Sequence, residues 1–179
     1  WAVPAFITIL IFRSMFNETF GVFNTTLLPA IGLENGLDWM TDPTYTKLAL
    51  IGIQWWLGFP YIMTLTTGIL QSIPEDLYEA ATIDGATAGE KFRLITLPMI
   101  LFATAPILIT QYTFNFNNFN IIYLFNNGGP AVPGQSAGGT DILISWIYKL
   151  SLGSNPQYGF AAAITLVLSF FIMTIAVIQ

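Results

Sequence analysis

Long apolar stretches without a charged side chain dominate the pattern of this sequence. They cover residues 1–12, 48–74, 94–140 and 150–179. A helix needs about 20 apolar residues to cross the hydrocarbon core of a membrane, and lipid offers no partner for backbone groups left unbonded within the span. The pattern therefore predicts an all-α, polytopic transmembrane helical bundle. We expect about four spanning segments in this fragment, at residues 1–16 (truncated), 46–70, 97–125 and 158–178.

The connections between these spans hold most of the polar residues and helix breakers. Thr41-Asp42-Pro43 is typical of a cap followed by proline at the first helical position, so it predicts the start of the second span. Residues 126–139 are rich in Asn, Gly and Pro and predict a loop. Apolar side chains then recur at helical spacing over residues 142–150, which predicts a short helix lying in the membrane interface.

The most polar connection, residues 71–93, lies between the second and third spans. Ser72-Ile73-Pro74-Glu75 predicts a capping box that contains a proline, and hence a helix start. Glu79-Ala80-Ala81 then leads to Asp84-Gly85-Ala86, where the alanines allow a partner to approach closely and Gly85 permits a sharp bend. A second short helix is expected at about 87–96, ending near Pro98 where the third span begins.

The composition agrees with a chain whose solvent is largely lipid. Of its 179 residues, 54% are hydrophobic and 8% are charged, against about 25% charged in soluble domains. The absence of Cys and His excludes disulfides, thiolate and Ser-His-Asp catalysis, and the usual zinc and haem ligand sets. We therefore expect no metal site. A net charge of −5 argues against binding nucleic acid through its phosphates.

Polar side chains at membrane depth mark the second and third spans, where each is costly unless it is satisfied. In the third span they are spaced i, i+4 and i+7, so they share one helix face next to Phe114; they are Gln111, Asn115 and Asn118. The matching positions of the second span are Gln54, Leu57, Gly58 and Tyr61. Pro60 kinks that span by removing a backbone hydrogen bond. Two such helices facing each other predict a cavity.

The chemistry of these positions suits a neutral, hydroxyl-rich ligand. Amide groups both donate and accept hydrogen bonds, which matches sugar hydroxyls, and aromatic rings offer flat apolar faces. No charged residue lies among these positions, which disfavours phosphate esters and amino acids. The alternative is that the amides hold helices together. For Asn115 and Asn118 both interpretations stay open.

The segment from Glu79 to Pro98 resembles the EAA loop of binding-protein-dependent ABC importer permeases. The family pattern is Glu-Ala-Ala, Asp-Gly-Ala, Phe, Ile and Leu-Pro at fixed spacing, and here every fixed position matches, through Phe92 and Ile95 to Leu97-Pro98. The resemblance implies a multi-pass protein of the bacterial cell membrane. It also implies a single permease domain over residues 1–179, lacking its N-terminal spans, with a cytoplasmic coupling loop at about 71–98. The residues that dock on an ATPase subunit would be Glu79, Ala80, Ala81, Asp84, Gly85 and Ala86.

The same resemblance implies a set of partners. No Lys follows a Gly, so the chain lacks a P-loop, and ATP and Mg²⁺ would bind to a separate ATPase. This chain is accordingly expected to bind no cofactor itself and not to be an enzyme by itself. The family assembles a permease with a second permease, two ATPase copies and an extracytoplasmic sugar-binding protein.

Further segments are similar to the larger membrane subunit of maltose and maltodextrin importers. They are residues 56–61, 114–119, 127–130 and 158–163. That subunit holds its sugar at mid-membrane, and by this resemblance the ligand positions are Gln54, Leu57, Gly58, Tyr61, Gln111, Phe114, Asn115 and Asn118. Gln54 and Gln111 are longer than the polar side chains of the best-known relative.

Three alternatives remain beside a maltodextrin permease. The chain could be an ABC permease for another sugar, a scaffolding permease whose partner alone holds the sugar, or an ion-coupled secondary transporter. Secondary transporters usually place carboxylates within their spans, whereas all 10 acidic residues lie outside the uncharged stretches here.

Overall fold

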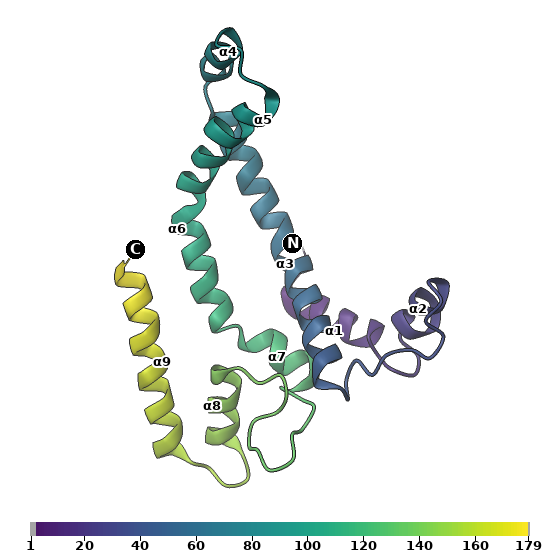
Figure 1. The fold of residues 1–179 in the computed structure, drawn as a ribbon. Helices are drawn as coiled ribbons and strands as arrows, with labels where there is room; N and C mark the ends of the chain where they lie inside the picture. Colours follow the sequence, from purple (N-terminus) through teal and green to yellow (C-terminus); the bar gives the residue numbers. More distant parts are fainter. Residues whose placement is uncertain (1–2, 179) are drawn as a thin grey trace. The chain divides into compact units, whose positions relative to one another are not determined.

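The structure is a computed structural model that describes residues 3–178, with side chains through Ile175. Within these residues the chain forms helices joined by turns and loops, with an isolated β-bridge between Ala131 and Gly138 (Figure 1). This confirms the all-α class. The α-helices and two π-helices (η) are α1 (Ala5–Met15), η1 (Phe23–Leu27), α2 (Leu28–Ala30), α3 (Pro43–Ser72), α4 (Glu75–Ile83), α5 (Ala88–Lys91), η2 (Phe92–Thr96), α6 (Leu97–Phe116), α7 (Phe119–Asn126), α8 (Leu143–Leu152) and α9 (Tyr158–Ile178).

Three helical segments of the described residues are long and apolar enough to cross a membrane: Pro43–Ser72, Ala88–Phe116 and Tyr158–Ile175. The first and third of these match the predicted spans at 46–70 and 158–178. The predicted span at 1–16 falls on α1, which has 11 residues. Such a helix extends about 16 Å, roughly half of a 30 Å hydrocarbon core. Trp1 and Ala2 of that prediction lie outside the described residues.

The predicted third span, 97–125, has the wrong boundaries. Helical structure begins earlier, at Ala88, and ends at Phe116. It ends there because the backbone N–H groups of Asn117 and Asn118 donate to the carbonyls of the residues three positions earlier instead of four, at 3.2 Å each. Asn118 also adopts a ψ of 74°, which is not helical. Asn favours such local turns over a continuing helix. Asn118 is therefore the residue before α7 and does not continue the helical register of Gln111 and Asn115.

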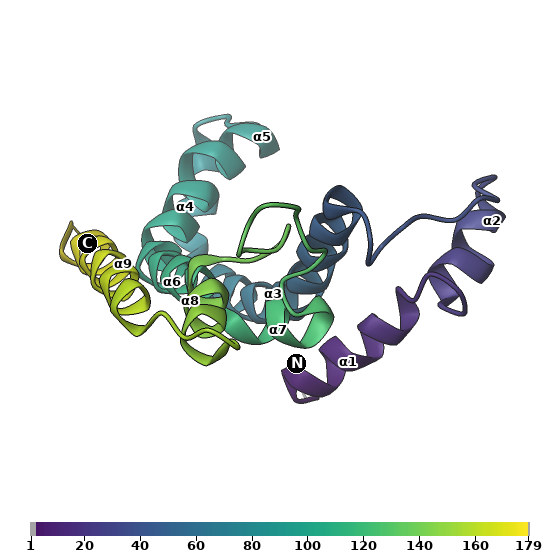
Figure 2. The same ribbon diagram turned by 90° about the horizontal axis from the view of Figure 1, so that it is seen from below.

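The chain divides into two compact units, one made of the described residues up to Leu57 with Thr113–Ile178, the other of Gly58–Tyr112. In the first unit, α1 packs against α7 and α8 packs against α9 (Figure 2). Phe16 stacks on Phe23 with ring centroids 4.1 Å apart. The buried core of this unit consists of Ile9, Phe16, Leu28, Trp39, Ala49, Leu50, Ile53, Ile121, Ile122 and Phe125.

Two polar side chains order the connection between α1 and α3. The Asn24 amide donates to the carbonyls of Glu18 and Leu37 at 3.1 and 2.9 Å, and its Oδ1 accepts from Leu37 N and Trp39 Nε1. The Glu18 carboxylate accepts from the backbone amides of residues 40–41 at 2.8 and 3.0 Å. These bonds close the connection over the core of the first unit.

The start of α3 is as predicted. Asp42 Oδ1 accepts hydrogen bonds from the backbone amides of Thr44 and Tyr45 at 2.7 and 3.1 Å. A side-chain oxygen in this position satisfies amides that have no partner inside the helix. Pro43 is accordingly the first residue of the helix.

The predicted capping box at Ser72 is wrong. The residue before α4 is Pro74, which makes no side-chain cap, and Ser72 Oγ donates instead to the carbonyl of Ile69 at 2.7 Å. Proline at this position fixes the backbone but leaves the serine outside capping reach. A capping box forms one helix later, where Thr87 and Glu90 bond each other's backbone amides at the start of α5.

The short helix expected at 87–96 does not end near Pro98. α5, η2 and α6 follow each other without a break, because the π-helical turn accommodates the proline. The amide of Leu97 bonds the carbonyl of Phe92, five residues back. In an α-helix the Pro98 ring would collide with the carbonyl of Leu94, and the extra residue of the π turn moves that carbonyl away.

Candidate functional site

Three amide side chains form a hydrogen-bonded cluster in the first unit. Gln54 on α3 donates from Nε2 to Asn115 Oδ1 at 2.5 Å, and its Oε1 accepts from Asn118 Nδ2 at 2.9 Å. Asn115 lies in the last turn of α6, and Asn118 immediately precedes α7. Gln54 therefore joins α3 to the chain on both sides of the break after Phe116. We call these three residues the amide cluster.

The break after Phe116, rather than helical spacing, brings Asn118 to this cluster. The sequence placed Asn115 and Asn118 on one face of one helix, and the structure places them on two helix ends that meet the same glutamine. Asn115 is exposed, whereas Gln54 and Asn118 are half-buried. Each primary amide offers two donor hydrogens and an acceptor oxygen, so the cluster can bond a ligand hydroxyl as well as its own members.

The other predicted ligand positions are distributed between the two units. Leu57 is half-buried one turn after Gln54, and Phe114 is 63% exposed beside Asn115. Three positions belong to the second unit: Gly58, Tyr61 and Gln111. Their part in binding a sugar stays a prediction.

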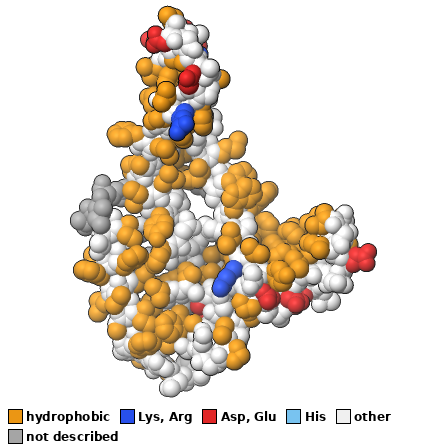
Figure 3. Space-filling model, viewed as in Figure 1, with side chains coloured by type: hydrophobic (Ala, Val, Ile, Leu, Met, Phe, Trp, Pro, Cys, Tyr) orange, Lys and Arg blue, Asp and Glu red, His pale blue; other side chains and the backbone are white. Residues whose placement is uncertain are grey.

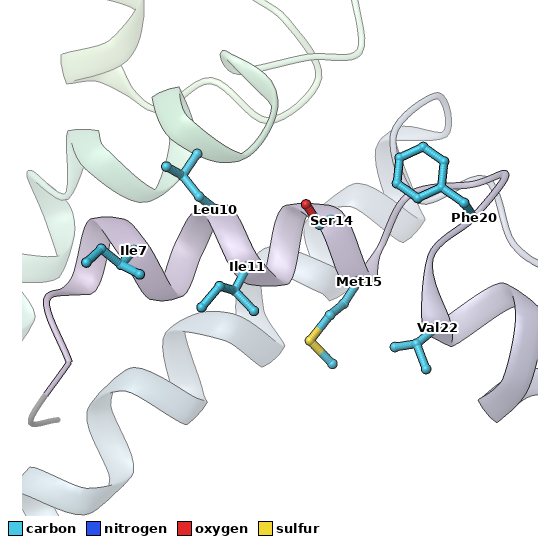
Figure 4. A pocket seen from close by; sticks show the side chains of 7 residues that line it. All are labelled: Ile7, Leu10, Ile11, Ser14, Met15, Phe20 and Val22. Carbon is cyan, nitrogen blue, oxygen red and sulfur yellow. The ribbon is translucent and has the colours of Figure 1, made fainter.

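An open apolar groove of about 550 Å³ runs along α1. Figure 4 shows Ile7, Leu10, Ile11 and Met15 on this helix, with Phe20 and Val22 on the chain that follows it. Ser14 contributes the one hydroxyl among the lining side chains. The groove therefore lacks the several polar groups that orient a sugar, and it is separate from the amide cluster.

The second unit presents the segment 79–86 at its surface. Glu79, Ala80 and Asp84 are exposed, and acidic side chains gather over α4 (Figure 3). Gly85 has a φ of +79°, and a Cβ added there would meet no described atom within 4 Å. Glycine is thus required by the backbone conformation of this turn and not by lack of space. Ala81 and Ala86 are half-buried.

Apolar side chains are exposed around the same segment. Leu77 is 42% exposed, Ile83 87%, Phe92 56% and Leu94 72%. Exposed apolar side chains on a polar connection are available for contact with a partner. We call these four residues the apolar patch.

A closed ring of hydrogen bonds joins α4 to the helix that follows it. The hydroxyls of Tyr78 and Thr96 are 2.8 Å apart, and Thr96 Oγ1 donates to the carbonyl of Lys91 at 3.5 Å. Lys91 Nζ donates to Thr82 Oγ1 at 2.6 Å, and Thr82 Oγ1 donates back to the carbonyl of Tyr78 at 2.6 Å. Sequence reasoning missed this ring, because none of its four members belongs to the EAA pattern. We call it the polar ring.

A buried ion pair fixes the loop between α7 and α8. Asp141, whose side chain is 1% exposed, accepts from Lys149 Nζ at 2.7 Å, from Ser145 Oγ at 2.8 Å and from Gly138 N at 2.6 Å. The sequence analysis missed this pair. A signal existed, since these are the only charged residues between Arg93 and Gln179, and they lie eight positions apart.

Aromatic contacts hold α7 against α8. Phe119 lies 5.0 Å from Tyr123 and 4.9 Å from Tyr148, measured between ring centroids. The hydrogen bond with Tyr123, together with the repulsion that two phenolates would exert on each other, raises the pKa of Tyr148 above its usual value. These contacts steady the end of α7 that carries Asn118. Among the described residues, no cluster of His, Cys, Asp and Glu could hold a metal ion.

Residues 1–179 match the family of binding-protein-dependent transport system inner membrane components. The chain belongs to this family and is an inner membrane component of a transport system, as the EAA pattern predicted.

Curated relatives carry the comparison further. The chain is 63% identical over 179 residues to the galactooligosaccharides transport system permease protein of Bacillus subtilis (strain 168), a match that covers 100% of this chain and 42% of that protein. It is 62% identical over 184 residues to the maltodextrin transport system permease protein of Streptococcus pneumoniae serotype 4, with 99% and 42% covered. It is 41% identical over 183 residues to the maltose/maltodextrin transport system permease protein of Escherichia coli (strain K12), with 100% and 35% covered. The chain thus spans less than half the length of these relatives.

The fold is also found among solved structures. The chain matches a bacterial ABC transporter involved in the import of the acidic polysaccharide alginate with a TM-score of 0.80 and 23% identity, over 98% of this chain and 59% of that chain. This likeness supports the permease fold, and at such identity it says nothing of the substrate.

Proposed function

We propose that this chain belongs to the membrane-spanning permease of an ATP-driven bacterial importer for maltodextrin or a similar neutral oligosaccharide. The observation that carries the proposal is the amide cluster, in which Gln54 on α3 bonds uncharged amides from the end of α6 and from the residue before α7. Identity of 61–63% to galactooligosaccharide and maltodextrin permeases supports an oligosaccharide as the substrate.

The charges of the spans favour a neutral substrate. α6 contains no charged residue, and α3 contains one, Lys47, in its first turns. A phosphorylated or acidic substrate at membrane depth would need a cationic partner there. Amides and the aromatic ring of Phe114 instead suit the hydroxyls and the apolar face of a sugar ring.

The coupling loop would connect the permease to its energy source. The exposed acidic residues of α4 and the apolar patch together suit a cleft with an apolar floor and a basic rim on an ATPase subunit. The chain lacks a P-loop of its own. The complete importer would contain this permease, a second permease, two ATPase subunits and an extracytoplasmic sugar-binding protein, and the ATPase subunits would bind ATP and Mg²⁺.

Transport would follow alternating access. Closure of the ATPase pair on ATP moves the coupling loop, and the helical segment from Ala88 to Phe116 runs without interruption from that loop to the residue after Asn115. The segment therefore offers a direct mechanical path from the loop to the amide cluster. Sugar released by the binding protein is then exposed alternately to the two sides of the membrane.

The test replaces Asn115 or Asn118 by leucine in the complete importer reconstituted in vesicles. Removal of one hydrogen-bond partner from a polar ligand costs about 1–3 kcal/mol, roughly 5- to 150-fold in affinity. The sugar concentration for half-maximal uptake should rise accordingly, or uptake should cease. ATP hydrolysis stimulated by the binding protein should persist at least in part, because the coupling loop is unchanged. Asn120→Leu, at an exposed position of α7, is the matched control.

Two outcomes would contradict the proposal in different ways. Normal uptake by the Asn115 and Asn118 variants, with failed assembly of Asn120→Leu, would make the amides helix contacts. The chain would then be a scaffolding permease whose partner holds the sugar. Uptake driven by a proton gradient in the absence of ATP would instead identify a secondary transporter.

A further inference from the structure

The polar ring carries an inference about how force reaches the transport path, and this inference rests on the proposed function. We propose that Tyr78 and Thr96 are positioning residues that lock α4 onto the start of the helical segment Ala88–Phe116, so that α4 and this segment move as one body. The EAA residues would then provide the docking contact, and the ring would transmit its displacement.

The geometry of the ring gives each hydroxyl a defined role. Thr96 is the buried residue of η2, with 8% exposure, and its hydroxyl bonds the Lys91 carbonyl five residues back, in the π-helical register. The Tyr78 and Thr96 hydroxyls are 2.8 Å apart, and either oxygen can donate in this contact. The second arm of the ring, from Lys91 to Thr82, returns to α4 at 2.6 Å. Two separate polar contacts therefore tie α4 to the segment that begins at α5.

The packing of α4 explains why such a lock is needed. α4, which lies wholly within the described residues, has no buried side chain, and Ile83 at its end is 87% exposed. The chain then turns through Gly85, whose φ of +79° and open surroundings leave little to resist rotation. Without the ring, a push on α4 would be absorbed by rotation about this turn. With it, the push reaches the helix that continues to Phe116.

The experiment removes single hydroxyl groups with Tyr78→Phe and Thr96→Val. The measurement is sugar carried per ATP hydrolysed by the complete importer in vesicles, together with co-purification of the ATPase. We expect this ratio to fall about two- to tenfold, the range for one hydrogen bond, while the ATPase still co-purifies. The double variant should be no worse than either single variant, because both break the same contact. Tyr158→Phe and Thr67→Val remove hydroxyls outside the ring and should leave the ratio unchanged.

A covalent replacement tests the lock directly. The chain has no native Cys, so Tyr78→Cys combined with Thr96→Cys can be joined by a short bifunctional thiol reagent. The unjoined variant should couple poorly, and joining should restore sugar carried per ATP. A purely structural role in folding would not be rescued in this way.

Three results would overturn the proposal. The first is an unchanged ratio in both single variants, and the second is loss of transport on crosslinking, which would mean that the contact must open. The third is failure of the ATPase to co-purify with the unmodified chain, in which case the proposed function is wrong as well. The first two leave the proposed function standing, so the two failures are distinguishable.

Discussion

Gly128 meets two independent requirements at the scale of a single residue. Its φ is +72°, which side-chain-bearing residues rarely adopt, and a Cβ there would overlap the buried Asp141 carboxylate. Gly134, in the same loop, has a φ of +78°, but a Cβ there would meet no described atom within 4 Å. A comparison of alanine substitutions at the two glycines therefore distinguishes the cost of backbone strain from the cost of steric overlap.

We predict that Gly128→Ala destabilises the purified permease more than Gly134→Ala. Both variants bear the cost of a left-handed backbone, about 1–2 kcal/mol, and only Gly128→Ala adds overpacking of about 1–3 kcal/mol. Thermal unfolding in detergent, followed by tryptophan fluorescence, measures the difference. Equal shifts in the unfolding temperature would mean that the Asp141 side chain moves aside without cost.

Gly85 gives a second prediction at the residue scale. Gly85→Val should abolish transport while membrane insertion stays intact, because a β-branched residue is strained at a φ of +79° and shifts the coupling loop. Gly89→Ala, within helix α5, is the control and should transport normally. ATP-dependent uptake and co-purification of the ATPase are the measurements. Full uptake by Gly85→Val would remove the docking role from this turn.

At the scale of elements, one local pattern occurs twice and gives the same structure. Phe23 and Phe92 each begin a π-helix, and each is followed six residues later by a Leu-Pro pair ending at Pro29 and Pro98. In both cases the amide after the π-helix bonds the carbonyl of the phenylalanine, five residues back. A proline that cannot fit the preceding α-helical turn is thus accommodated by one extra residue.

We predict that Pro98→Ala converts η2 to α-helix. Without the pyrrolidine ring, the amide of residue 98 can bond the Leu94 carbonyl, so the amides of residues 94–97 should exchange more slowly than in the unmodified chain in hydrogen–deuterium exchange. The register of Thr96 relative to Tyr78 changes at the same time, so sugar carried per ATP should fall. Pro106→Ala, inside α6, is the control without a π-helix. Unchanged exchange over 94–97 would mean that other contacts hold the π turn.

The sequence predicts an element well when the residues that determine it are close together in the chain. Charge-free length predicts α3 and α9, and the Asp42-Pro43 pair predicts where α3 begins, because each cause lies within a few residues. The helix break before Asn118 and the failure of Ser72 to cap α4 both result from local hydrogen bonds that compete with helical ones. The periodicity of apolar residues carries no information about this competition. The hydrogen bonds of the amide cluster join residues that are 61 and 64 positions apart in the sequence, and the bond between Tyr78 and Thr96 joins residues 18 positions apart. Composition and spacing can therefore single out a polar residue but do not predict its hydrogen-bond partner.

At the scale of the whole molecule, the order of the spans predicts which surfaces share a side of the membrane. Pro43–Ser72 lies between Asn35 and Ile83 in the sequence, and Ala88–Phe116 lies between Ile83 and Gln135. If both segments cross, Asn35 and Gln135 lie on one side of the membrane and Ile83 on the other. Under the proposed function, the side of Ile83 is the cytoplasm, where the ATPase would dock, and Asn35 and Gln135 face the outside. All three side chains are exposed, Ile83 by 87%.

The last prediction uses the absence of native Cys, which leaves no background for thiol labelling. Asn35→Cys and Gln135→Cys should react with a membrane-impermeant maleimide added to intact cells. Ile83→Cys should react only after the membrane is permeabilised, because α3 carries the chain across between positions 35 and 83. Labelling of Ile83→Cys alone from outside would invert the topology and remove the coupling loop from the ATPase. Labelling of all three from one side would show that Pro43–Ser72 and Ala88–Phe116 do not cross the membrane.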